Sequence, residues 1–182
     1  ENPSDIFLSE RPADAAGSII VSSMEGSRPL LVEVQALVTS SSSIGMPRRM
    51  SAGFDHNRTS LLVAIMEKRL GLNLQGEDIF INIAGGLKVS EPAVDMGVAA
   101  AIAGSFRNQS VDPHTVLIGE VGLTGEVRSV MQLEARLVEV ARLGFKRCIV
   151  PHSIKGDKLI NKKSSLSLIS VKTLSEAFDA VF

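Results

Sequence analysis

The sequence lacks tryptophan and tyrosine, and seven phenylalanines supply its whole aromatic content, 4% of 182 residues. Proteins that hold single-stranded nucleic acid tightly usually stack bases on aromatic side chains. Because the phenylalanines here lie mostly within apolar runs, base stacking has little support. Any contact with nucleic acid is therefore expected to involve the phosphate backbone.

Cysteine is almost absent too, since Cys148 is the only one. A single cysteine excludes a disulfide framework and a cysteine-based zinc site within this chain. The apolar residues beside it in KRCIVP favour a buried structural thiol. The three histidines, His56, His114 and His152, are far apart and lack ligand spacing, so no metal site is predicted.

Charge of one sign is not in excess either, with 19 basic and 20 acidic residues. DNA would therefore have to be held by a local patch, because the overall field does not attract phosphate. No apolar run reaches the roughly 20 residues of a membrane span, so no membrane contact is expected. Phosphate-binding glycine loops and a G-x-S-x-G turn are also missing, which argues against a nucleotide site and a serine-hydrolase elbow.

The chain divides into an expected arm or linker over residues 1–16, rich in turn formers and charges, and one domain over residues 17–182. It opens ENPSDIFL, without a starting Met or a signal peptide, and we expect it to be a piece of a longer protein. Two β-rich runs joined at residues 25–28 predict a hairpin. Residues 40–56 show neither the helical nor the strand spacing of apolar residues, and this predicts a long loop.

Alternating strands and helices follow. Strands are predicted at 79–84, 115–121, 126–130, 147–151 and 166–171, and helices at 55–70, 92–106, 131–143 and 174–182. Asp55 or Asn57 is the expected N-cap of the first helix. Its buried face is predicted to carry Leu61, Leu62, Ile65, Met66 and Leu70, and that of the third helix Leu133, Leu137, Val140 and Ala141. The mixture predicts an α/β fold, an α+β arrangement around a mixed sheet.

Two stretches carry a family resemblance. Residues 88–105 read KVSEPAVDMGVAAAIAGS, and residues 119–151 read GEVGLTGEVRSVMQLEARLVEVARLGFKRCIVP. The region from Phe80 to Pro151 resembles the proteolytic domain of the Lon family, where K-D-G-P-S-A-G opens a helix of small residues and a T-G-x-V hairpin precedes a helix with a lysine. The resemblance implies a Lon proteolytic-domain-like fold, of the ribosomal protein S5 domain 2-like type.

The active-site residues of that family are missing from this sequence. On its frame, Asp95 stands in the place of the nucleophilic serine and Glu134 in the place of the catalytic lysine. A serine–lysine peptidase needs a hydroxyl beside an amine that takes its proton, so the resemblance implies no catalytic residues here. We expect Asp95 to be a first-turn acid that accepts backbone N–H bonds at the helix N-terminus. A more specific alternative is that Asp95 and Glu134 face each other as an acid–base pair.

Together, NPSDIFLSER, SMEGSRPLLVEVQALV, FDHNR, AGGLKVSEPAVD and GEVGLTGEVR resemble the C-terminal domain of the bacterial RadA (Sms) family of DNA-repair ATPases. The resemblance implies a hexameric ring that assists DNA binding while an upstream motor drives branch migration in recombination. It also implies a zinc finger and a RecA-like ATPase ahead of this domain, hence Zn, ATP and Mg there and no cofactor here. The recombinase RecA is the implied partner and the bacterial cytoplasm the implied location, with a plant organelle as the alternative.

Four basic residues are the candidate DNA contacts. Arg48 and Arg49 lie in the irregular stretch 40–56, where phosphate contact and a solvated loop are equally compatible with the sequence. Arg58 favours a capping role or an ion pair with an acid of a neighbouring subunit. Lys88 is either a further phosphate contact or an ordinary surface lysine.

Two other functions stay open at this point. One is a peptidase that uses a different serine, Ser90 or Ser105, with Lys88 as the base. The other is a protein-interaction module, for which Ile6, Phe7 and Leu8 of the arm are the candidate apolar contacts.

Overall fold

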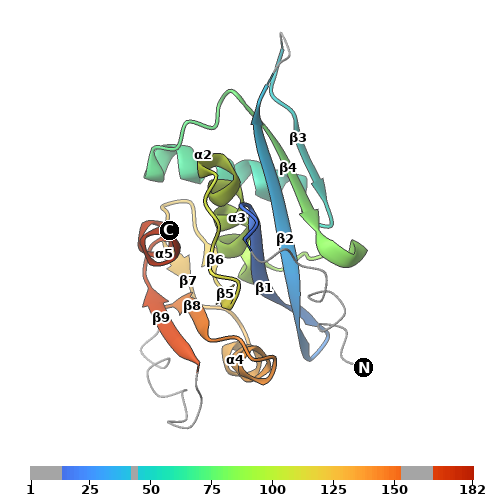
Figure 1. The fold of residues 1–182 in the computed structure, drawn as a ribbon, viewed down its shortest axis with the longest axis vertical. Coiled ribbons are helices and arrows are strands. Elements are labelled where there is room, and N and C mark those ends of the chain that lie inside the picture. Colours follow the sequence, from blue (N-terminus) through green and yellow to red (C-terminus); the bar gives the residue numbers. More distant parts are fainter. Residues whose placement is uncertain (1–13, 42–44, 153–165) are drawn as a thin grey trace.

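The computed structural model describes residues 14–41, 45–152 and 166–182, so most of the predicted arm, with Ile6, Phe7 and Leu8, lies outside the described residues. A seven-stranded sheet runs through the domain in the order β3-β4-β2-β1-β5-β8-β9 (Figure 1). Its pairs β1–β2 and β2–β4 are antiparallel and the others are parallel. The predicted α/β fold with a mixed sheet is confirmed. None of the described helices is long and apolar enough to cross a bilayer.

The predicted hairpin is formed by β1 (Ser18–Glu25) and β2 (Arg28–Ser40), two long strands side by side in Figure 1. Glu25 pairs with Arg28, so the turn consists of Gly26 and Ser27. Gly26 has a φ of 61°, which glycine adopts without the steric cost of a Cβ. The turn residues therefore set the register of the two strands.

The stretch 40–56 is not only a loop, because Arg49–Ala52 forms β3, which pairs in parallel with β4 (Glu77–Ile83). This part of the sequence prediction was wrong. A four-residue strand at the edge of a sheet has one neighbour and only partial burial, so it needs no alternation of apolar and polar residues. The open edge of β4 decides the pairing, and that edge is a feature of the tertiary structure.

Helices cover both faces of the sheet. The core on one face takes side chains from α2 (His56–Leu70), α3 (Asp95–Arg107) and α5 (Leu174–Val181). The core on the other face takes them from α4 (Leu133–Arg142). Along β1, Ile19 belongs to the first core and Ile20 to the second, as the alternation of a strand requires.

The remaining elements are short. β5 (Thr115–Leu117), β8 (Arg147–Pro151) and β9 (Ser167–Val171) complete the large sheet, β6 (Glu120–Val121) and β7 (Val127–Arg128) form a two-stranded sheet, and η1 (Ala84–Gly86) and η2 (Pro92–Val94) are single 3-10 turns. The predicted helices and the other predicted strands are present with their ends shifted by a few residues, but the single strand predicted at 115–121 is wrong, because β5 and β6 belong to different sheets. Cys148 is buried as predicted, and burial raises the pKa of its thiol.

Two residues predicted to face the core do not. Leu61 on α2 is 42% exposed, and Ala141 on α4 is exposed. Each stands at the margin of the buried stripe of its helix, about 40° of rotation beyond a buried residue four positions away, Ile65 for Leu61 and Leu137 for Ala141. On α4 the stripe is shifted by Arg136, a charged residue that is only 1% exposed and takes a place that the sequence pattern assigns to apolar residues.

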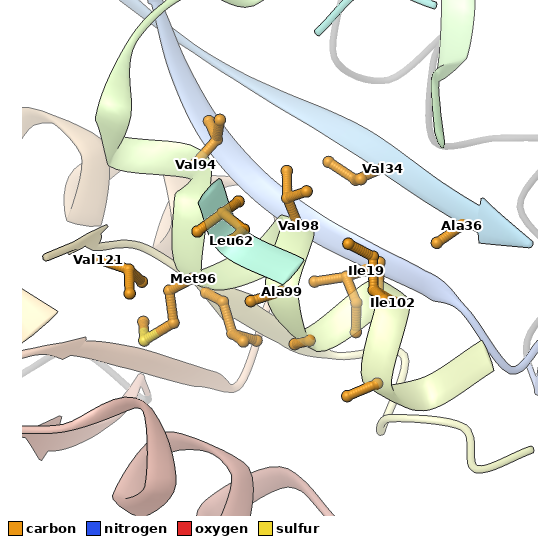
Figure 2. Close-up of a cluster of buried hydrophobic side chains, with 14 of the residues drawn as sticks. Ile19, Val34, Ala36, Leu62, Val94, Met96, Val98, Ala99, Ile102 and Val121 are labelled. Carbon is orange, nitrogen blue, oxygen red and sulfur yellow. The ribbon is translucent and has the colours of Figure 1, made fainter. Parts of the chain in front are cut away.

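Small residues let α3 enter the centre of the fold. All ten residues from Asp95 to Gly104 are buried, and Figure 2 shows Val98 and Ile102 of this helix beside Ile19 of β1 and Val34 of β2. Gly97 lies against β1 so closely that an added Cβ would stand 2.0 Å from Cγ1 of Val21. The helix can approach the sheet this closely only because residue 97 has no side chain.

Replacing Gly97 with alanine is therefore expected to destabilise the fold, although alanine is the better helix former. Overpacking a tight core costs about 1–3 kcal/mol, which outweighs a gain of about 1 kcal/mol in helix propensity. The free energy of unfolding in urea measures the effect. Gly76→Ala is the control, since a Cβ at Gly76 meets nothing within 4 Å, and equal stability of the two variants would contradict the expectation.

Candidate functional site

Asp95 is the first residue of α3 and its side chain has no exposure. The 3-10 turn η2, opened by Pro92, leads into the helix. Two backbone bonds hold this entry, because the Met96 N–H donates to the Gly119 carbonyl at 3.1 Å and the Gly119 N–H donates to the Ala93 carbonyl at 2.8 Å. The carboxylate is thereby anchored between the helix start and the segment that enters β6.

Arg58 of α2 binds this carboxylate with two nitrogens. Its Nε donates to Oδ1 of Asp95 at 3.0 Å and its Nη2 donates to Oδ2. Nη2 also donates to the Val121 carbonyl at 2.8 Å, while the Val121 N–H donates to Oδ2 of Asp95 at 3.1 Å. The predicted acceptance of a backbone N–H by Asp95 is thus correct, but the donor belongs to β6 and not to the helix that Asp95 opens.

The acid that pairs with Arg58 lies in the same chain, and this answers the question that the sequence left between a cap and a neighbouring subunit. The cap of α2 is Asp55, whose Oδ1 accepts the Arg58 N–H at 2.7 Å. This carboxylate positions the first turn of α2, and that turn directs the Arg58 side chain toward α3. Of the two predicted N-caps, Asp55 is confirmed and Asn57 is not.

Burial raises the pKa of Asp95 above its ordinary value, and the negative charge of Glu120 acts in the same direction. The hydrogen bonds and positive charge of Arg58, together with the Val121 N–H, oppose that rise. In return, the hydrogen bond to Asp95 raises the pKa of Arg58. The carboxylate is fully buried and bound to a partly exposed guanidinium, so Asp95 itself offers no hydroxyl that could act as a nucleophile.

A second ion pair lies beside the first. Arg136 of α4 binds Glu91 with two nitrogens, Nη1 at 2.9 Å from Oε1 and Nη2 at 2.6 Å from Oε2. Arg136 also donates to the carbonyls of Ser22 at 2.7 Å and Met131 at 3.1 Å, and Oε1 of Glu91 accepts the Met24 N–H at 2.6 Å. Our sequence reasoning missed this pair, although an arginine between Leu133 and Val140 on a buried helix face was a signal.

Glu134 is not part of this network. It is exposed on α4, and it forms no hydrogen bond or ion pair with any described residue. Nor is it among the groups that shift the pKa of Asp95. The structure therefore does not bring Asp95 and Glu134 together as an acid and a base.

Both ion pairs border one cavity of about 170 Å³. Its lining includes Phe54 and Pro92, the N-cap Asp55, the exposed Ser90, and three members of the two pairs, Arg58, Glu91 and Asp95. Within residues 14–41, 45–152 and 166–182, no three His, Cys, Asp or Glu side chains are placed to hold a metal ion. The cavity thus contains carboxylates that are already bound to arginines.

The predicted DNA contacts differ in their surroundings. The Arg48 side chain is 59% exposed, but it pairs with Asp78, Nη2 to Oδ2 at 2.7 Å, and lies 5.5 Å over the Phe80 ring. The Arg48 backbone N–H and side chain hold the pKa of Asp78 below its ordinary value. Arg49 at the start of β3 and the exposed Lys88 have no ion-pair partner among the described residues.

The alternative serines are also separated. The Ser105 hydroxyl accepts the Val38 N–H at 2.9 Å near the last turn of α3. Lys88 precedes the first turn of that helix, and the ten steps along the helix from Asp95 to Ser105 span about 15 Å. Ser90 is exposed at the cavity, two residues from Lys88. Only Ser90 is thus placed near the lysine that was considered as its base.

Known proteins resemble this chain over most of its length. Residues 34–154 match the model of the family described as subunit ChlI of Mg-chelatase. The DNA repair protein RadA of Halalkalibacterium halodurans is 53% identical over 178 residues, covering 98% of this chain and 38% of that protein. The proteins of the same name from Bacillus subtilis and Streptococcus pneumoniae are 52% and 46% identical, covering 97% and 100% of this chain. The chain spans 38% and 42% of those two relatives.

Removing Arg58 alone is expected to destabilise the fold strongly. In Arg58→Met the buried Asp95 carboxylate loses its counter-charge, and breaking such a pair costs about 3 kcal/mol. In Arg58→Met with Asp95→Leu both charges are absent, so most of the stability should return. Urea unfolding of the two variants measures the difference, and a double variant as unstable as the single one would contradict this role.

The loss of folding stability in Arg58→Met should also depend on pH. Without Arg58, burial acts unopposed by a cation and raises the Asp95 pKa further. A raised carboxyl pKa contributes stability at low pH that is lost as pH rises through the folded-state pKa. The deficit relative to the native chain should therefore be largest at neutral pH and smaller as pH falls toward the ordinary Asp value.

Proposed function

This chain belongs to the RadA family of DNA repair proteins, and we propose that it serves there as a Lon-like domain without peptidase activity. In this proposal the domain joins copies of the protein and helps to hold DNA by its backbone. The proposal rests on the family membership and on the chemistry of the cavity at Asp95.

The observation that carries the proposal is the buried ion pair of Asp95 with Arg58. On the Lon frame this is the position of the nucleophile, and a peptidase would need an activated hydroxyl there. A carboxylate with a bound guanidinium provides no attacking group. The same pair supports a structural role, since it joins α2, α3 and β6 at one point.

The resemblance to the RadA family is the basis of the roles that we propose for the whole protein. We place this domain in a hexameric ring, beside a zinc finger and a RecA-like motor that uses ATP and Mg to drive branch migration, with RecA as a partner in the bacterial cytoplasm. The chain spans about two fifths of its relatives' length, which is compatible with further domains in those proteins. Zn, ATP and Mg would belong to those domains.

For DNA, Arg49 and Lys88 are the residues we propose as phosphate contacts. Arg48 and Arg58 already bind Asp78 and Asp95, so a phosphate would have to compete with a carboxylate at each of them. A contact through two basic side chains reads no base sequence. It predicts weak affinity, strong salt dependence and little preference among duplexes.

Absence of peptidase activity is tested with a serine-reactive fluorophosphonate probe on the native chain. We expect no labelling, because Asp95 replaces the nucleophile and the Ser105 hydroxyl lies at the other end of α3. Ser90→Ala is the matched control. Labelling of the native chain that disappears in Ser90→Ala would overturn the proposal in favour of a peptidase based on Ser90.

Phosphate contact is tested by measuring duplex affinity over a range of salt concentrations. Arg49→Ala and Lys88→Ala should each weaken binding, and the slope of log K against log salt should fall by about 0.9 for each lost contact. Lys172→Ala is the control, since Lys172 is an exposed lysine at the opposite end of the sheet, after β9. Native affinity and slope in both variants would exclude these two residues as contacts.

A further inference from the structure

The stretch of chain that leads from β4 to α3 has the form of an edge strand. Leu87 and Glu91 at its two ends have extended backbone angles, with ψ of 152° and 144°. Between them Lys88 is exposed, Val89 is buried and Ser90 is exposed, which is the alternation of a strand with one buried face. The stretch belongs to neither of the two sheets. We call it, from Leu87 to Glu91, the edge segment.

Only one side of the edge segment is bonded to the rest of the domain. The Val89 N–H donates to the carbonyl of Gly53, just after β3, at 2.7 Å. Successive residues of an extended chain direct their backbone groups to opposite sides, so those of Lys88 and Ser90 point away from Gly53. They form no hydrogen bond with another described backbone group. Because a row of unpaired N–H and C=O groups is a template for a further strand, this side can pair with an extended chain.

Two cavities border the edge segment, one along each half. Its first residues, Leu87 to Val89, line a cavity of about 80 Å³ beside the hairpin of β1 and β2. Ser90 and Glu91 line the cavity of about 170 Å³ at Arg58. In recognition by an added strand, main-chain hydrogen bonds supply affinity and pockets for alternate side chains supply specificity. A peptide paired with the edge segment would pass both cavities.

The larger cavity carries one negative charge without a counter-charge. Arg58 balances Asp95 within the cavity. Glu91 is balanced by Arg136. Asp55 accepts the neutral Arg58 N–H on Oδ1, but it has no ion-pair partner among the residues that the structure describes. Because Asp55 is exposed at the cavity, the site favours a cation and disfavours phosphate.

The remaining lining of this cavity indicates the shape of that cation. Phe54 and Pro92 offer apolar surface, and the exposed Ser90 offers a hydroxyl. Lysine and arginine side chains lay their methylene stems along apolar surface and keep the charged end at polar groups. One such side chain would lie with its stem on Phe54 and Pro92 and its charge at Asp55.

We propose that the edge segment binds an extended peptide of a partner protein, with a lysine or arginine side chain of that peptide in the cavity at Asp55. The backbone N–H and C=O groups of Lys88 and Ser90 hold the peptide as an added strand. The inference goes beyond the proposed function, since neither self-assembly nor phosphate contact enters into it. It uses the Lys88 backbone, whereas the proposed phosphate contact uses the Lys88 ammonium group.

The charge preference is tested with short fluorescent peptides of alternating threonine and valine that carry lysine, glutamine or glutamate at the centre. In fluorescence polarisation the native chain is expected to bind the lysine peptide most tightly. Asp55→Asn should weaken binding of the lysine peptide by about fivefold, as for an exposed ion pair, and leave the glutamine peptide unchanged. Asparagine caps a helix as well as aspartate does, so this variant keeps the start of α2.

The backbone contact is tested with Ser90→Pro. Proline removes the N–H of residue 90 and fits an extended backbone, so affinity for the lysine peptide should fall by about tenfold. Ser90→Ala is the matched control, because it also lacks the hydroxyl but keeps the N–H. If Ser90→Pro unfolds, a lysine peptide methylated at its backbone nitrogens gives the same test on the native chain.

Failure of the native chain to bind any of the three peptides overturns the inference. Equal affinity for the lysine and glutamate peptides overturns it as well, because the cavity would then not select a cation. Equal affinity for the methylated and unmethylated peptides excludes an added strand. If lysine amide binds as tightly as the lysine peptide, the cavity holds small amines and not an extended chain. If Ser90→Pro weakens binding of a DNA duplex as much as binding of the peptide, the edge segment belongs to a DNA contact instead.

Discussion

The ion pair between Arg58 and Asp95 is the interaction on which the centre of this domain depends. Asp95 has no exposure, and a buried carboxylate without a partner would be far costlier than a lost surface contact. The pair can form only if α2 begins at Asp55, α3 begins at Asp95 and β6 presents Val121. One charge thus ties together three elements that are far apart along the chain.

The pair of Arg136 with Glu91 extends this arrangement to the other side of the sheet. Arg136 is 1% exposed, and besides Glu91 it binds the backbone of β1 through the Ser22 carbonyl. α4 is therefore fixed to the hairpin and to the start of η2 by charge-assisted hydrogen bonds as well as by apolar packing. Two arginines from opposite helix layers thus bind the carboxylates Asp95 and Glu91, which border one small cavity.

The two pairs account for two of the arginines of this domain. Outside them, Arg49 and Lys88 are cations without an ion-pair partner among the described residues. The small-residue helix α3, packed on Val21 through Gly97, keeps the centre of the fold tightly packed around these pairs.

The sequence by itself determined the local elements, because turn residues, caps and apolar periods act over a few neighbouring residues. The turn at Gly26, the N-cap Asp55, the buried Cys148 and the strand at 147–151 all follow from such patterns. Only the tertiary structure decided which charges meet, since Arg58 and Asp95 are 37 positions apart in the sequence and Glu91 and Arg136 are 45 apart, too far for a local signal of their pairing. The edge strand β3 and the exposure of Leu61 were decided in the same way, by which surfaces of the sheet and helices remained open.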